Sequence, residues 1–118
     1  MEEEDSKQKI IRIRKRDGRI VEFVPEKITN AIFKAAEAVG GHDKKIAEEL
    51  TRKVVTILEY KFGPKEIPTV EEVQDIVEKV LIKNGHAKTA KAYILYRQQH
   101  EKIREIKDTF VDVNNTIS

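Results

Sequence analysis

The sequence predicts an α+β domain in which a small three-stranded β-sheet covers a bundle of four helices. Short apolar–polar alternation flanks a turn at 16–18, and four later segments carry apolar residues at helical spacing. Hydrophobic residues make up 39% and charged residues 37% of the 118 residues, which suits one soluble, helix-rich domain with a modest core. We expect this domain to span residues 10–107, after a disordered leader at 1–9 and before a linker at 108–118.

The first element is a β-hairpin formed by "IIRIR" and "RIVEF" around Arg16-Asp17-Gly18. A two-residue loop would pair Ile13 with Glu22 and mix apolar and charged side chains on one face. A three-residue loop pairs Ile13 with Val21, and by the same register Ile11 with Phe23, so that one face is apolar. We therefore prefer the second register, with Gly18 in the left-handed conformation that closes such a loop.

Local signals set the bounds of the four helices. Pro25 suits the first turn of a helix that Gly40-Gly41 ends, and a second helix runs from about residue 43 to 62 before Gly63-Pro64. Thr69 and Glu72 form a capping box for a third helix, which ends at Asn84-Gly85. The fourth is expected from about residue 87 to 107. Between the second and third helices, "KEIPT" is extended and provides either a third strand or a single β-bridge.

Composition excludes several classes of function. The chain has no cysteine, which excludes disulfides, thiol chemistry and cysteine-ligated zinc or iron–sulfur sites. Only three histidines are present, so we expect no metal site. The absence of cysteine also leads us to expect a cytoplasmic location. No run of about 18 apolar residues is found, so we expect no membrane span. Nothing resembles a Walker P-loop or a nucleophile with its base, so the chain alone is not expected to be catalytic.

The stretch "KRDG" at the hairpin tip has two interpretations. Charged hairpin tips are commonly only solvated turns. Alternatively, Lys15 and Arg16, beside a turn with free backbone amides, bind phosphates. Lys27 lies in the first helical turn, where the helix dipole disfavours a cation, and an anion bound there would offset that cost. Because the hairpin and this helix start are close in sequence, Lys15 and Lys27 could converge on one anion.

A third candidate is the segment "KTAKAYILYRQQHEK". Its tyrosines are at helical spacing, which is more often a feature of a core than of a site. Arg97 follows Tyr96 directly and Tyr93 by four residues. An arginine among buried tyrosines needs a carboxylate or phosphate partner.

Together these stretches resemble the ATP-cone, the regulatory nucleotide-binding domain at the N-terminus of many ribonucleotide reductases. The resemblance covers residues 11 to about 107 and rests on "KRDG", "EKI", "PTVEEVQDIVEKVL" and "AKAYILYR" in that order. It implies four helices under a three-stranded sheet, and ATP or dATP as an allosteric ligand, usually with Mg²⁺. The tail "DTFVDVNNTIS" is similar to the stretch that leads into the catalytic body of the anaerobic, class III ribonucleoside-triphosphate reductases.

The resemblance also implies roles for particular residues. Lys15, Arg16 and Lys27 match phosphate-binding positions, and Ile13 and Ile28 match the lining of the base site. The start of the third helix contributes around Thr69 to Gln74. The remaining residues of the implied site are Gly18, Val70, Tyr96, Arg97 and Gln99. Some members carry an acid where this chain has Val21, and Glu22 is expected to face outward.

Three kinds of function follow as expectations. The first is allosteric control of a reductase, with the catalytic body or a second copy as partner and no direct binding to nucleic acid or membrane. The second is a free-standing nucleotide sensor related to a bacterial repressor that joins this domain to a zinc ribbon, although the ribbon's cysteines are absent here. The third is a protein-interaction module without a small ligand.

Overall fold

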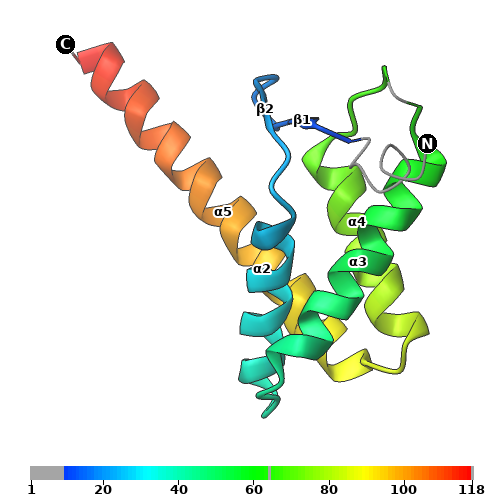
Figure 1. The fold of residues 1–118 in the computed structure, drawn as a ribbon. Coiled ribbons are helices and arrows are strands. Elements are labelled where there is room, and N and C mark those ends of the chain that lie inside the picture. The colour runs from blue at the N-terminus through cyan, green and yellow to red at the C-terminus, as the bar shows by residue number, and fades with distance from the viewer. Residues whose placement is uncertain (1–9, 64, 118) are drawn as a thin grey trace.

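The computed structural model describes residues 10–63 and 65–117, with side chains up to residue 107. The elements are β1 (Arg12–Arg14), β2 (Ile20–Glu22), α2 (Pro25–Ala38), α3 (Lys44–Lys61), α4 (Val70–Lys83) and α5 (Ala87–Ile117). The hairpin lies at one end of the helices, and α5 crosses the bundle and then continues beyond it (Figure 1). The predicted leader at 1–9 lies outside the described residues.

The predicted hairpin register is confirmed. Ile13 pairs with Val21, and Arg12 pairs with Glu22 on the other face. The N–H of Gly18 donates to the carbonyl of Lys15 at 2.9 Å, and φ of Gly18 is 90°, which is a left-handed conformation that other residues rarely adopt. The loop therefore has the three residues predicted for it and holds Lys15 at its base.

The predicted third strand is reduced to a bridge. In the described residues the sheet has two strands, and an isolated parallel bridge joins Arg14 to Thr69. The N–H of Arg14 donates to the carbonyl of Pro68 at 2.9 Å. Pairing stops there because proline has no N–H to donate and Thr69 already caps α4. The prediction of a three-stranded sheet was therefore wrong, whereas its alternative of a single bridge is confirmed.

The predicted inward position of Ile11 is also wrong. Ile11 is 64% exposed, whereas its neighbour Ile10 is 2% exposed and belongs to the core. Strand β1 begins only at Arg12, so its alternation does not extend back to these residues. The carbonyl of Ile11 still accepts a hydrogen bond from the N–H of Phe23 at 2.7 Å.

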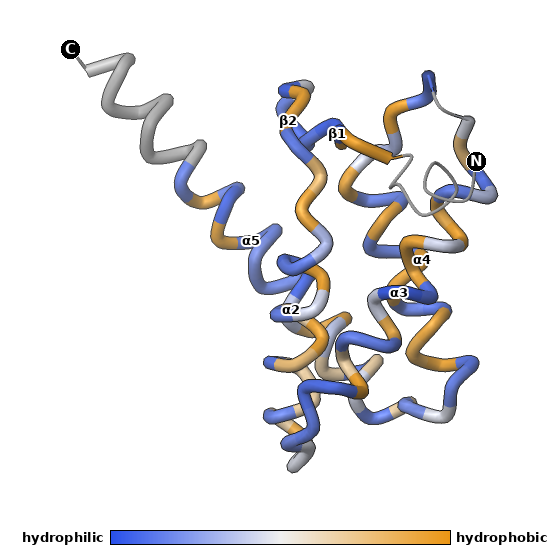
Figure 2. The backbone as a smooth tube through the Cα atoms, viewed as in Figure 1, coloured by the Kyte–Doolittle hydropathy of each residue, from blue (hydrophilic) through white to orange (hydrophobic). Residues whose placement is uncertain are grey.

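The helices share one core, and their apolar stretches recur along each helix of the bundle (Figure 2). Val54 and Leu58 of α3 and Val77 and Leu81 of α4 are almost completely buried. A buried hydrogen bond of 2.7 Å joins the hydroxyls of Thr29 and Thr51 and so satisfies the polar groups between α2 and α3. In the described part of the chain, no helix combines the length and apolarity that a bilayer crossing requires.

The last helix continues to Ile117 rather than ending at about Lys107 as predicted. No glycine or proline follows Gly85, so no residue with strong helix-breaking character interrupts it. The linker role of residues 108–118 stays a prediction. The backbone of this segment is helical up to Ile117. The side chains of Phe110 and the residues after it lie outside the described ones.

Candidate functional site

A cavity of about 210 Å³ lies between the hairpin and the first turns of α2 and α4, and it is closed on one side by α5. Six of the predicted site residues line it, namely Ile13, Lys15, Lys27, Ile28, Val70 and Gln74. The structure thus brings together residues from three separate stretches of the chain. Lys15 and Lys27, which the sequence suggested could converge, line the same cavity.

The walls of this cavity are mostly apolar. Phe23 and Val73 add buried apolar surface to that of Ile13 and Ile28. Lys15 is partly buried and Lys27 is exposed, so the cations stand beside an apolar surface. Such a combination can hold a flat apolar group that carries an anion.

The position of each lysine follows from local structure. Lys15 directly follows β1, and its N–H donates to the carbonyl of Arg19 at 2.7 Å across the loop. Lys27 is in the first turn of α2, a helix that begins at Pro25 without a side-chain cap. The positive end of the α2 dipole therefore lies beside Lys27, and both favour an anion there.

A second cavity of about 180 Å³ adjoins the first, because Val70 and Gln74 line both. It lies between the hairpin tip, α4 and the middle of α5. Its lining is polar and includes three arginines, Arg16, Arg97 and Arg104. Arg16 therefore lines the second cavity, whereas Lys15 lines the first.

Carboxylates hold the Arg16 side chain in this second cavity. Its Nη2 donates to Oε1 of Glu101 at 2.8 Å, and its Nε lies 3.6 Å from Oε2 of Glu71. These two acids come from α5 and α4, so Arg16 links the hairpin tip to both helices. Any phosphate that binds Arg16 must compete with them.

Arg97 also has carboxylate partners. The sequence predicted either a carboxylate or a phosphate as the partner of this arginine. Its Nη1 donates to Asp75 at 2.9 Å and to Glu78. Desolvation opposes its charged form, but these hydrogen bonds outweigh that effect and raise the pKa of Arg97. Arg97 therefore ties α5 to α4.

Four predicted site residues line neither cavity. Thr69 caps α4 by accepting from the N–H of Glu72 at 3.1 Å, and Gly18 closes the hairpin loop. Tyr96 and Gln99 lie on α5 outside both linings, and the ring of Tyr96 contacts that of His100 with centroids 4.2 Å apart. These four lie outside both linings, so their role in ligand binding stays a prediction.

Two polar residues that line the first cavity, Tyr93 and Glu22, were not among the predicted site residues. Tyr93 lines it and is buried, and this burial raises the pKa of its phenol. Its position four residues before Arg97 is the only signal of this in the sequence. Glu22, expected to face outward, is exposed but also contributes to the lining of this cavity.

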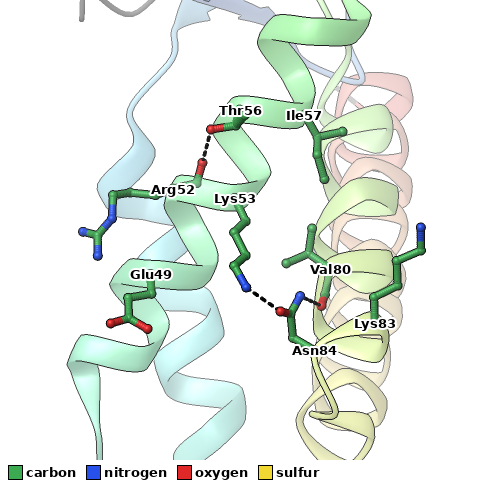
Figure 3. Close-up of a pocket in the computed structure, with 8 residues that line it drawn as sticks. All are labelled: Glu49, Arg52, Lys53, Thr56, Ile57, Val80, Lys83 and Asn84. Carbon is green, nitrogen blue, oxygen red and sulfur yellow. Dashed lines mark hydrogen bonds between the residues drawn. The ribbon is translucent and has the colours of Figure 1, made fainter.

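A larger groove of about 560 Å³ lies between α3 and α4 (Figure 3). Lys53 reaches across it and donates to Oδ1 of Asn84 at 2.6 Å, whereas Arg52 points away from α4. None of the predicted site residues lines this groove. Its cations do not converge, so we place the candidate site at the two adjoining cavities despite their smaller volumes.

Comparison with known families gives a match to a model described as the ATP cone domain, over residues 11–102. Among curated proteins, a vitamin B12-dependent ribonucleoside-diphosphate reductase of Thermoplasma acidophilum is 48% identical over 99 residues. That alignment covers 80% of this chain and 12% of the relative.

Two further relatives are reductases of other types. A ribonucleoside-diphosphate reductase subunit alpha of Chlamydia muridarum is 35% identical, with 83% of this chain and 10% of the relative covered. An anaerobic ribonucleoside-triphosphate reductase of Haemophilus influenzae is 34% identical, with 77% and 13% covered. The chain thus spans only about an eighth of the length of such relatives.

Proposed function

The chain belongs to the ATP-cone family, and on this premise we propose that it binds ATP or dATP at the two adjoining cavities. The base lies against the apolar walls formed by Ile13 and Ile28. The phosphates lie at Lys15 and Lys27 and extend toward Arg16. The convergence of two lysines from separate elements on one apolar cavity is the observation that carries this proposal.

The size of the site supports the use of both cavities. Pockets for small ligands usually measure about 300–1,000 Å³, which is more than either cavity offers alone. The two together reach that range, and Val70 and Gln74 form their common boundary. A triphosphate chain can therefore pass from one to the other beside the start of α4.

Magnesium fits this site as a companion of the phosphates. Mg²⁺ keeps several waters and is commonly held by substrate phosphates with one or two carboxylates. Glu22 lines the first cavity and Glu71 the second, so each offers a carboxylate near the proposed path of the phosphates. In the part of the chain that the structure describes, no group of three or more acidic or histidine side chains forms a separate metal site.

The proposed role of nucleotide binding is allosteric control of a ribonucleotide reductase. The relatives are reductases of several types, of which the anaerobic ribonucleoside-triphosphate type is the one predicted from the tail sequence. The domain would act on a catalytic body or on a second copy by changing its own shape or surface. Such a ligand shifts the equilibrium between two conformations of the domain only to the extent that it binds one conformation more tightly than the other.

Calorimetric titration of the chain with ATP and with dATP, each with Mg²⁺, tests the proposal. We expect saturable binding of both, and weaker binding of the pyrimidine nucleotide CTP, whose base offers less surface to the apolar walls. The absence of binding by ATP and dATP would sink the proposal and leave a protein-interaction module. Binding by this chain without any effect on a reductase would favour a free-standing nucleotide sensor.

A further inference from the structure

The middle of α5 carries exposed apolar side chains at regular spacing. Tyr96, Ile103 and Ile106 are 37%, 50% and 51% exposed, and Gln99 is the polar member of the same series. The steps between these four positions are three, four and three residues. This is the spacing of the two apolar positions of a heptad repeat, which forms the seam of a coiled coil. We call these four residues the α5 seam.

The sequence continues this spacing beyond Ile106. Phe110, Val113 and Ile117 follow at steps of four, three and four residues, and the backbone is helical up to Ile117. The pattern therefore spans three heptads, the length at which such a repeat becomes specific. In the coloured part of α5, short apolar stretches alternate with polar ones (Figure 2).

The α5 seam lies on a different side of the helix from the candidate nucleotide site. The α5 residues that line the second cavity are Arg97, His100, Glu101 and Arg104. At 3.6 residues per turn, their mean direction is about 130° away from that of the α5 seam. A partner helix can therefore contact the seam while Glu101 still holds Arg16.

The charges beside the seam decide which partner fits. In a paired helix, the positions flanking the seam contact the partner's flanking positions. Here they include Lys102 and Lys107. The flanking positions beyond Lys107 are threonine and asparagine in the sequence, so none of them is an acid. We propose that the α5 seam binds a helix whose own apolar seam is flanked by carboxylates.

A second copy of this chain fits less well. Two parallel copies in register would place Lys102 of one opposite Lys107 of the other, and like charges at these positions repel. Antiparallel copies gain no opposite charges either, because no acid flanks the seam. This choice of partner is independent of whether the domain binds a nucleotide.

The test uses two labelled peptides, each of three heptads with isoleucine and leucine in the seam. One has glutamate at every flanking position and the other has lysine, so each repels itself and stays monomeric. Fluorescence anisotropy is recorded as the 118-residue chain is added. We expect the glutamate peptide to bind at least tenfold more tightly, with a difference that shrinks as salt screens the charges.

Two variants locate the binding surface. Ile106→Glu should weaken binding of the glutamate peptide tenfold or more, and since Ile106 is half exposed the fold should survive, as circular dichroism would show. Gln98→Glu adds the same charge to an exposed position outside the seam and its flanks, and should retain most of the binding.

Equal affinity for the two peptides, or no binding of either, would overturn the proposal. So would sedimentation that reveals a dimer of the chain lost in Ile106→Glu, because the partner would then be a second copy. Binding to phosphatidylserine vesicles without binding to the glutamate peptide would likewise overturn it in favour of a membrane surface.

Discussion

Arg16 and Glu101 are 85 residues apart in the sequence, yet a hydrogen bond of 2.8 Å joins their side chains. The pair connects the tip of the hairpin to the middle of α5. Because Arg16 is also a proposed phosphate ligand, the carboxylate of Glu101 would compete with a phosphate for this side chain. Nucleotide binding at Arg16 and the contact between hairpin and α5 are therefore expected to compete.

Removal of either cavity lysine should weaken nucleotide binding. A charge-assisted hydrogen bond contributes roughly 1.5–3 kcal/mol, so Lys15→Ala and Lys27→Ala should each lower the affinity for ATP about tenfold or more. Lys34→Ala is the matched control, since Lys34 is an exposed lysine of α2 that lines neither cavity. Calorimetry that finds the same affinity in Lys15→Ala and the wild type would remove Lys15 from the site.

Loss of the competing carboxylate should strengthen binding. Glu101→Gln removes the charge that holds Arg16, and exposed ion pairs of this kind contribute up to about 1 kcal/mol. The affinity for ATP should therefore rise about two- to fivefold. Glu105→Gln makes the same change one turn along α5, outside the cavity lining, and should have little effect. A weaker or unchanged affinity in Glu101→Gln would show that Arg16 does not release Glu101 for the phosphate.

Variants of Thr69 distinguish a structural role of this residue from a role in ligand binding. Thr69→Ala removes the hydroxyl that accepts from the N–H of Glu72, and loss of such a cap costs about 1 kcal/mol in the free energy of unfolding. Thr69→Ser keeps the hydroxyl and should keep most of the stability. Urea denaturation measures both. If Thr69→Ala weakens ATP binding without loss of stability, Thr69 contacts the ligand in the bound state.

The buried phenol of Tyr93 should make the fold sensitive to alkaline pH. Burial raises its pKa in the folded state above that of the unfolded chain, so its contribution to stability is complete below about pH 10 and is lost as pH rises beyond that value. The free energy of unfolding should fall more steeply above about pH 10 in the wild type than in Tyr93→Phe. If the free energy of unfolding falls in parallel with pH in the two proteins, Tyr93 is excluded as the source of the alkaline sensitivity.

Nucleotide should change an assembly rather than a reaction. The proposed regulatory role requires the nucleotide to act through the shape or the surface of the domain. Light scattering with no nucleotide, with ATP and with dATP should give different masses, for the chain or for a longer natural protein that contains it. If every sample keeps one mass and both nucleotides leave the longer protein's activity unchanged, the regulatory role fails.

The sequence predicted those features that depend on neighbouring residues. Thr69 and Glu72 determine where α4 begins, and the choice of one apolar face determined the hairpin register. Lys15 and Lys27 are only twelve residues apart, so their convergence could also be foreseen.

Features that depend on distant residues could not be predicted in this way. Arg16 is in the hairpin loop and its hydrogen-bond partner lies on α5, and nothing near Arg16 in the sequence indicates Glu101. The burial of Ile10 rather than Ile11 depends on where β1 begins, which is set by tertiary packing. The same holds for Tyr93, whose place in the cavity wall requires the hairpin, α2 and α4 to be assembled.

The length of α5 converts a small angular change into a large movement. Its 31 residues form one continuous helix about 46 Å long, and only its first part packs on α2 and α4. If the loss of the Arg16–Glu101 contact allowed α5 to tilt by about 10° around Tyr93, its far end would move by about 6 Å. The helix is thus a lever arm, and the displacement it delivers grows with the distance from its pivot rather than with the strength of the contact that was broken.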